Sequence, residues 1–261
     1  MIADRINIKI SGQVNGPPLI LHHALGVNLE MWQPQLSALE PHFRVIRMDM
    51  RGHGKSLPTD APYSLEDLAD DVITVLDHLN IEKADYLGIS IGGMIGSALA
   101  LQHPTRINRL ILSNTTSQIM KEMHPMWDAR IQSVREGGMD TQIDITLMRW
   151  FTPEYQSKNP ETLKWVAAMV CETSPEGFIG CCEAIKGLDF LKRLPEIDTP
   201  CLVITGAKDL GTPPEKSYDI QAAIKGAQLE IIDEVAHLSN VQAPEKFNTL
   251  ITSFLIKGDH P

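Results

Sequence analysis

Residues 84–93 read ADYLGISIGG, in which a Gly-x-Ser-x-Gly motif follows an apolar run. The run at 84–89 predicts a buried strand, and residues 91–103 predict a helix that Pro104 stops. A serine on so tight a strand-to-helix turn projects its Oγ from a strained backbone, and the flanking glycines leave room for neighbouring main chain. The start of the helix also favours the negative charge of a developing oxyanion. We therefore predict Ser90 as a nucleophile; the alternative is a glycine-rich packing turn.

Short apolar or β-branched runs alternate with helical patterns on both sides of this motif. The clearest helix follows Ser64, which forms a variant of the capping box with Asp67, and its apolar residues share one face. Alternation of this kind predicts an α/β fold with a mostly parallel sheet flanked by helices. Further strands are predicted at residues 6–10, 19–22, 43–48, 110–113, 201–205 and 229–232, and a closing helix at 245–255.

The alternation of strand and helix patterns stops between residues 117 and 194, where no convincing strand pattern occurs. This segment is rich in Met, Trp and Glu and is broken by Gly137-Gly138, Pro153, Pro160 and Pro175. We predict a helical cap at 117–194, inserted in a core formed by residues 1–116 and 195–261.

Two residues downstream of Ser90 have the positions expected of its catalytic partners. A serine hydroxyl needs a base to become a nucleophile, and the chain order in this arrangement is serine, acid, histidine. Asp209 and His237 each follow a predicted strand, at the sheet edge where α/β proteins build their sites. A surface Asp in a turn and a capping His are the alternatives. Asp233 and Glu234 compete for the acid role, but they directly precede His237 and would have to fold back on it.

An oxyanion hole would use the backbone N–H of Ile91, just after the nucleophile, and a second N–H from the loop after strand 19–22. Leu25 is the candidate in that loop. The pair His22-His23 does not predict a metal site, because adjacent side chains of a strand point apart and no His-Glu-x-x-His motif occurs. Nor do residues 54–56, Gly-Lys-Ser, predict a phosphate loop, since Asp49 stands where that pattern requires glycine.

Composition limits the partners. The formal net charge is −10, the pI is about 5.3 and no run of Lys or Arg stands out, which argues against a nucleic-acid partner. Four cysteines without a Cys-x-x-Cys spacing predict buried, reduced thiols. The first residues lack a secretory pattern, and the longest near-apolar stretch, 88–101, is too short to span a bilayer. We expect a cytoplasmic protein with no membrane partner; the sequence leaves monomer and homodimer open.

Several motifs lie at residues 25–32, 49–56, 88–93 and 237–240, and two further stretches, RWFTP at 149–153 and TSPEGF at 173–178, lie in the expected cap. The first four together resemble motifs of the α/β-hydrolase superfamily. The two cap stretches resemble more closely the 3-oxoadipate enol-lactonases of the bacterial β-ketoadipate pathway. The sequence departs from these enzymes at Ile91, where methionine is frequent, and at 22–24, His-His-Ala, where small polar residues are common.

This resemblance implies an eight-stranded sheet and a cofactor-free serine hydrolase of aromatic-compound catabolism. The substrate would be a small enol-lactone with a carboxylate arm. Arg149 and Arg130 are the candidates for binding the arm, with Trp150 lining the pocket; a surface charge is the alternative for each arginine. A carboxylesterase, a hydrolase of carbon–carbon bonds in ring-fission products, or a cofactor-free peroxidase would share the fold and triad. A non-catalytic receptor that uses the same pocket is a further alternative.

Overall fold

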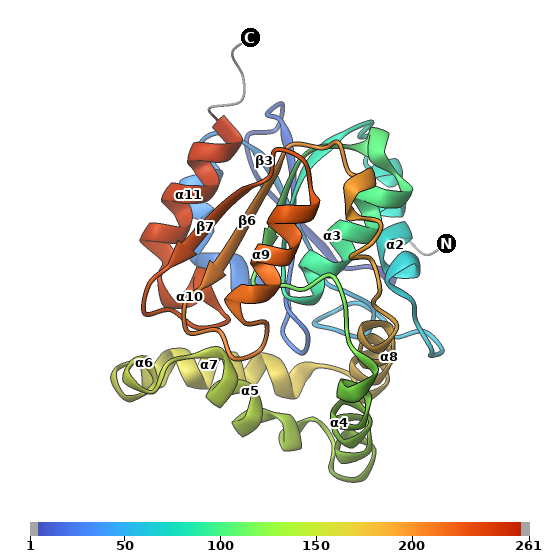
Figure 1. Ribbon diagram of the computed structural model, residues 1–261, viewed down its shortest axis with the longest axis vertical. Helices are drawn as coiled ribbons and strands as arrows, with labels where there is room; N and C mark the ends of the chain where they lie inside the picture. Colours follow the sequence, from blue (N-terminus) through green and yellow to red (C-terminus); the bar gives the residue numbers. More distant parts are fainter. Residues whose placement is uncertain (1–4, 257–261) are drawn as a thin grey trace.

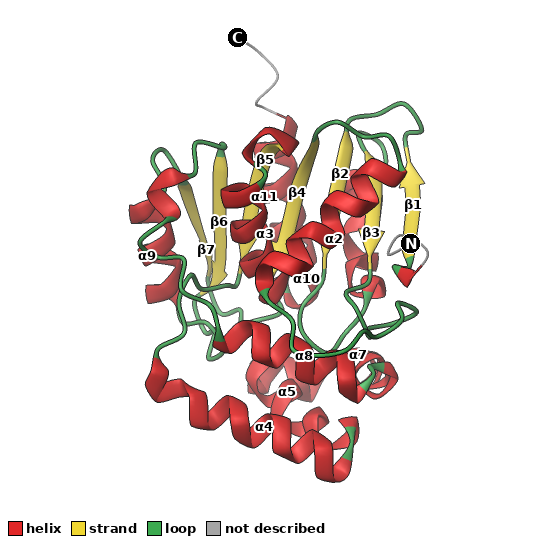
Figure 2. Ribbon diagram, turned by 90° about the vertical axis from the view of Figure 1, so that its right-hand side faces the viewer, coloured by secondary structure: helices red, strands yellow, loops and turns green. Residues whose placement is uncertain are grey.

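A computed structural model describes residues 5–256 of the chain. Within these residues seven strands form one sheet in the order β1-β3-β2-β4-β5-β6-β7, as Figures 1 and 2 show. β1 runs antiparallel to β3, and every other neighbouring pair is parallel. The strands are β1 (Ile8–Gly12), β2 (Pro18–His22), β3 (Arg44–Met48), β4 (Ala84–Ile89), β5 (Ile107–Ser113), β6 (Cys201–Gly206) and β7 (Gln228–Ile232).

The expectation of eight strands is wrong for the described part of the chain. Residues 5–7, which precede β1, contact the segment after β3: the carbonyl of Arg5 accepts the N–H of Leu57, and the carbonyl of Asn7 accepts the N–H of Asp49. The first strand, Ile8–Gly12, begins later than the expected 6–10.

Helices cover both faces of the sheet (Figure 1). On one face α2 packs against α3, and on the other α11 packs against α1. The predicted capping box is confirmed: the Asp67 N–H donates to Ser64 Oγ at 3.0 Å, and the Ser64 N–H donates to Asp67 Oδ2 at 2.8 Å. The core helices are α1 (Leu36–Leu39), α2 (Leu65–His78), α3 (Ile91–Gln102), α9 (Pro214–Ala223), α10 (Ser239–Gln242) and α11 (Pro244–Ile256).

Five further helices lie between β5 and β6 in the sequence and form a layer across the carboxyl ends of the strands (Figure 2). This confirms that the insertion is helical. Its only β pairing in the described chain is an isolated bridge between Gln118 and Asp189. The boundaries 117 and 194 stay predictions. The helices are α4 (His124–Gly137), α5 (Ile143–Trp150), α6 (Pro153–Lys158), α7 (Pro160–Glu172) and α8 (Pro175–Lys186).

The start of α8 rests directly on the loop after β3. The Ser174 N–H donates to the Gly52 carbonyl at 2.7 Å. Gly52 has φ +68°, and a Cβ there would lie 2.5 Å from the Gly177 Cα, so neither position has room for a side chain. Two backbones without side chains therefore meet where the helical layer joins the core.

Two expectations drawn from composition have an outcome in the structure. No helix within residues 5–256 combines the length and the apolar character needed to cross a bilayer. All four cysteines are free thiols, and Cys181, Cys182 and Cys201 are buried as expected. Cys171 is exposed, so the expectation of burial was wrong there; its Sγ lies 3.4 Å from Asp140 Oδ1 near the protein surface.

Candidate active site

Ser90 occupies the turn between β4 and α3 in a strained conformation. Its φ of 59° and ψ of −120° are unusual for a residue with a side chain, and such strain costs about 1–3 kcal/mol. Neighbouring β5 holds it in place: the Ser90 N–H donates to the Ser113 carbonyl at 2.9 Å, and Thr115 Oγ1 donates to the Ser90 carbonyl at 2.7 Å. The surrounding structure thus holds the strand-to-helix turn that the sequence predicted, and the Ser90 side chain in it is buried.

The glycines around Ser90 are required by close approaches of the backbone. A Cβ on Gly88 would lie 2.1 Å from the Gly92 carbonyl oxygen. A Cβ on Gly92 would lie 2.4 Å from the carbonyl oxygen of His22, on β2. Because both obstacles are main chain, a larger residue at either position would displace the turn itself.

Asp209 and His237 come together at the carboxyl ends of β6 and β7. His237 Nδ1 lies 2.8 Å from Asp209 Oδ2 and 3.0 Å from Oδ1, and both side chains are buried. Burial alone raises the pKa of Asp209. The charge and hydrogen bond of His237, with hydrogen bonds from Asn114 and Thr212, outweigh it and hold that pKa below its ordinary value. The carboxylate therefore stays ionised and fixes the imidazole through Nδ1, which leaves Nε2 for a substrate or nucleophile.

Sequence reasoning missed two residues that support Asp209. Asn114 Nδ2 donates to Asp209 Oδ2 at 2.9 Å, and Thr212 donates to the same carboxylate through its hydroxyl and its N–H, each at 2.9 Å. Asn114 directly follows β5, so the strand-end argument that found Asp209 and His237 could have found it. Thr212 comes three residues after Asp209, a spacing typical of a turn that caps an Asp side chain.

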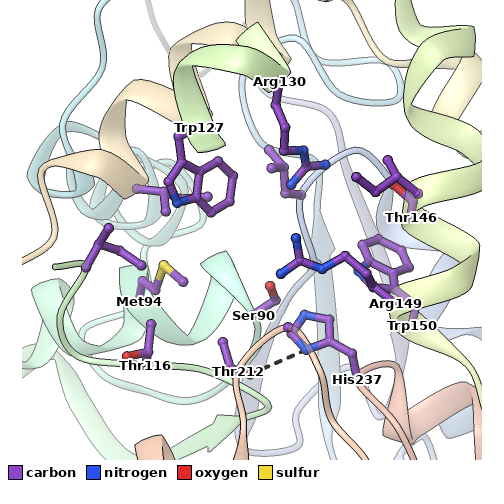
Figure 3. A pocket seen from close by; sticks show the side chains of 15 residues that line it. Ser90, Met94, Thr116, Trp127, Arg130, Thr146, Arg149, Trp150, Thr212 and His237 are labelled. Atoms are coloured by element: carbon purple, nitrogen blue, oxygen red, sulfur yellow. Dashed lines mark hydrogen bonds between the residues drawn. The ribbon is translucent and has the colours of Figure 1, made fainter. Parts of the chain in front are cut away.

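Ser90 and His237 line one small cavity, which Figure 3 shows with the contact between Thr212 and His237. The two acids that compete with Asp209, Asp233 and Glu234, lie outside this cavity. Glu234 is exposed and lies 3.5 Å from Lys208 Nζ, and neither it nor Asp233 lines the cavity. The core lines the cavity with Leu25, Ser90, Met94, Thr116, Gly211, Thr212 and His237, and the insertion lines it with Ile119, Trp127, Arg130, Ile145, Thr146, Arg149, Trp150 and Ile185.

The two candidate oxyanion donors flank the serine. Ile91 is the first residue of α3, so its N–H has no acceptor within the helix. Leu25 lines the cavity from the loop after β2, as the sequence predicted for the second donor. The next N–H of that loop, from Gly26, donates to His53 Nε2 at 3.0 Å.

Arg130, Arg149 and Trp150 all line the cavity, and Figure 3 shows both guanidinium groups pointing into it. Trp150 lies beside His237, with ring centroids 6.0 Å apart. No Asp or Glu is among the cavity-lining residues of the described chain. The arginines therefore give the cavity an uncompensated positive charge in a protein whose net charge is −10. Both arginines are partly buried, and their contact with a substrate stays a prediction.

Arg130 is held by groups that sequence reasoning missed. Its Cζ lies 5.1 Å from the ring centroid of Trp127 and 5.2 Å from that of Phe178, and its Nε donates to Gln142 Oε1 at 3.0 Å. Burial lowers the pKa of Arg130, and Arg149 lowers it further, while Cys182 acts in the opposite direction. These contacts join α4, α8 and the turn before α5. No local sequence pattern predicts these contacts, because they depend on tertiary packing.

The motifs that the sequence analysis set aside have structural roles. Within residues 5–256, no group of three or more His, Cys, Asp or Glu side chains is arranged to hold a metal ion. His22 Nδ1 lies 2.8 Å from Tyr86 Oη, and His23 Nε2 accepts the Met50 N–H at 2.9 Å. Asp49, at the start of the segment that mimics a phosphate loop, accepts the N–H groups of Leu29 and Lys55.

Comparisons with known proteins agree with this geometry. A family profile described as the alpha/beta hydrolase fold matches residues 17–244. The chain is 37% identical to 3-oxoadipate enol-lactonase 2 of Acinetobacter baylyi, over 96% of this chain and 92% of that protein. The crystal structure of an enol-lactonase from Burkholderia xenovorans superposes with a TM-score of 0.92 at 37% identity, over 96% of both chains. A hydrolase from Pseudomonas aeruginosa gives 0.93 at 37% identity, over 96% of this chain and 94% of that one.

Proposed function

The chain belongs to the α/β-hydrolase family and is a hydrolase, and from this premise we propose that it opens 3-oxoadipate enol-lactone to 3-oxoadipate, in aromatic-compound catabolism. The observation that supports this substrate best is the distribution of charge in the cavity. Ser90 and His237 lie on the core side, two arginines lie on the other, and no carboxylate among the described residues faces them. A small ester with an anionic arm complements this arrangement.

The first step is the attack of Ser90 Oγ on the lactone carbonyl while His237 Nε2 takes the hydroxyl proton. Asp209 holds Nδ1 and stabilises the imidazolium that forms. The N–H groups of Ile91 and Leu25 bind the oxyanion of the tetrahedral intermediate. Its collapse breaks the ring C–O bond, and the leaving enolate oxygen takes the proton from the His237 imidazolium to give an enol, which tautomerises to the ketone. The substrate stays attached to Ser90 as an acyl ester.

The second step is hydrolysis of this acyl-enzyme. His237 removes a proton from water, the resulting hydroxide attacks the ester carbonyl, and the same two N–H groups bind the oxyanion. Collapse returns the proton to Ser90 Oγ and frees the second carboxylate. Neither step requires a cofactor.

The carboxylate arm of the substrate binds Arg130. The aromatic rings of Trp127 and Phe178 and the amide of Gln142 fix this guanidinium, so little rotamer freedom is lost when an anion binds. Gln142 uses Nε, which leaves the outer Nη groups available for a bidentate contact. Arg149 adds positive charge beside the reacting ester, and its contact with Met126 Sδ at 3.7 Å is weak.

The cavity favours a small molecule over a long acyl chain, since its volume is about 60 Å³. The predicted cap, residues 117–194, would exclude bulk water during the reaction. A carboxylesterase or a hydrolase of carbon–carbon bonds would use the same serine, so the choice between them depends on substrate turnover.

The test is hydrolysis of 3-oxoadipate enol-lactone by the wild-type chain, by Ser90→Ala and by Ser97→Ala. Ser97 is a matched control: it lies on the same helix, and its buried hydroxyl donates to the Gly93 carbonyl at 3.2 Å. We expect kcat/KM of about 10⁴ M⁻¹s⁻¹ or more for the wild type, little change in Ser97→Ala and loss in Ser90→Ala.

A fluorophosphonate probe separates the possible failures. If the wild type ignores the lactone but the probe labels Ser90, the nucleophile stands and the proposed substrate falls. If neither reaction occurs, the proposal of a catalytic serine is wrong and a receptor role gains support.

A further inference from the structure

The loops after β2 and β3 are joined by two buried histidines, each of which accepts a backbone N–H from the opposite loop. His23, in the first loop, accepts the Met50 N–H of the second loop through Nε2 at 2.9 Å. His53, in the second loop, accepts the Gly26 N–H of the first through Nε2 at 3.0 Å. The two rings are fully buried, with centroids 5.2 Å apart. Each loop therefore depends on a side chain from the other.

The hydrogen bonds assign one tautomer to both rings. Because each Nε2 accepts a proton, each Nδ1 must carry the single ring proton of a neutral imidazole. His23 Nδ1 donates to the Ala24 carbonyl at 2.8 Å, and His53 Nδ1 donates to the Arg51 carbonyl at 3.0 Å. Burial is the main reason that the pKa of His23 falls to about 4 and that of His53 to about 3, so both rings stay neutral at physiological pH.

Both peptide groups that flank Leu25 are bound by these histidines. The Ala24 carbonyl and the Leu25 N–H belong to one planar peptide group, so the bond from His23 also sets the direction of the Leu25 N–H. The Leu25 carbonyl and the Gly26 N–H form the next peptide group, which His53 holds. The orientation of the Leu25 N–H is thus fixed from both sides.

We propose that His23 and His53 are positioning residues, which aim the Leu25 N–H at the oxyanion and so act in the transition state without touching the substrate. This inference rests on the proposed function, in which Leu25 supplies one of the two oxyanion donors. A misaimed donor weakens binding of the transition state more than binding of the ground state. Loss of the histidines therefore lowers kcat and leaves KM nearly unchanged.

Substitutions at His53 test whether the acceptor for the Gly26 N–H matters. His53→Leu removes this acceptor, and we expect kcat to fall about ten- to a hundredfold, with KM within about twofold of the wild type. His53→Gln keeps an oxygen near the position of Nε2, and we expect it to restore most of kcat. Ile111→Val is the matched stability control, because it removes one methylene from the buried centre of β5, away from both loops.

Substitutions at His23 keep the test decisive if His53→Leu fails to fold. The amide of His23→Asn can still donate to the Ala24 carbonyl but cannot reach the Met50 N–H, whereas His23→Leu does neither. We expect kcat near the wild-type value for His23→Asn and a fall of at least tenfold for His23→Leu. If the two variants lose kcat equally, the proposed role of the Ala24–Leu25 peptide group is wrong.

A direct readout of the oxyanion hole uses 1,1,1-trifluoroacetone, whose adduct with serine carries an oxyanion, and 3-oxoadipate as a ground-state ligand. For His53→Leu we expect the inhibition constant of the ketone to rise at least tenfold and that of 3-oxoadipate to change less than twofold. The proposal would be overturned if the two inhibition constants changed equally, or if kcat were unaltered in His53→Leu. A similar loss of kcat in Ile111→Val would also overturn it. Binding of the ketone requires only an activated serine. The inhibition constants therefore test the positioning role even if the enzyme does not hydrolyse the lactone.

Discussion

Single residues around the reacting atoms divide into those that touch the substrate and those that hold the others in place. Asp209 belongs to the second kind, and it is itself held by Asn114 and Thr212. Asn114 has φ +45°, and its Oδ1 accepts the hydroxyl protons of Ser113 and Ser239, so its amide cannot rotate freely. The fixed Asn114 amide therefore orients the Asp209 carboxylate, and this carboxylate orients the His237 imidazole.

We expect Asn114→Leu to lower kcat about tenfold. The Asn114 amide donates to the Asp209 carboxylate and favours its ionised form, so its removal weakens both the orientation and the charge of the group that holds His237. The measurement is kcat with 3-oxoadipate enol-lactone at pH 7. Ser239→Ala is the control, because it removes only a donor to Asn114; an unchanged kcat in Asn114→Leu would contradict this account.

We expect Arg130→Gln to raise KM for the lactone about ten- to a hundredfold, because a charge-assisted pair with the carboxylate arm is lost. Arg130→Lys should recover only part of the affinity, since an ammonium lacks the planar fork. Steady-state kinetics on the lactone and on its neutral methyl ester provide the measurement, with exposed Arg135→Gln of the same helix as control. An equal effect on acid and ester would rule out the carboxylate contact.

At this scale the sequence could predict most of the functional residues that follow a strand end, although Asn114 was missed, and it could not predict those that depend on packing. Ser90, Asp209 and His237 follow the parallel strands β4, β6 and β7, so topology alone brings them to one edge of the sheet. The stacking of Trp127 and Phe178 on Arg130 joins α4 to α8, and no spacing along the chain encodes the relative position of these helices.

Among the secondary-structure elements, the prolines and glycines that interrupt the insertion mark its helix ends, which its composition does not. Pro153, Pro160 and Pro175 were predicted only as interruptions, and each is the first residue of a helix: α6, α7 and α8. Proline suits this position because the first helical N–H has no acceptor within the helix. Gly138 likewise ends α4 with φ +71°.

We expect Gly177→Ala to destabilise the protein by about 1–3 kcal/mol, because the new methyl group would meet the main chain of Gly52 at 2.5 Å and α8 would have to shift. Urea unfolding measures the change. Gly187→Ala, at the other end of α8, is the matched control, since its nearest neighbour would be 3.5 Å away. Equal stability of the two variants would show that the start of α8 can move away from the core at little cost.

For the whole molecule, the buried histidines connect stability to pH. Burial lowers the pKa of His23 to about 4 and that of His53 to about 3, and it also lowers that of His22, which the charges of His23 and His53 lower further. In the unfolded chain these groups take up protons near pH 6.5, whereas in the folded protein they stay neutral until well below that. Between about pH 6.5 and 4 the unfolded state binds more protons, so the free energy of unfolding falls as the pH falls.

We expect this loss to approach about 1.4 kcal/mol per pH unit for each of the three histidines within that window. Urea unfolding at pH 7, 6 and 5 gives the slope for the wild type. The side chain in His53→Gln does not titrate. The slope of its free energy of unfolding against pH should therefore be smaller by about the contribution of one histidine. An identical slope in the variant would assign the acid sensitivity to other groups.

The contact between Gly52 and Gly177 also bears on how this enzyme could acquire new substrates. The arginines of the cavity come from the stretch between β5 and β6, while the serine, aspartate and histidine lie outside it, so recognition and bond cleavage occupy separate parts of the gene. A recombination event that exchanged this stretch would bring a new specificity to an unchanged reaction. The exchanged segment would have to arrive with a glycine where it meets Gly52.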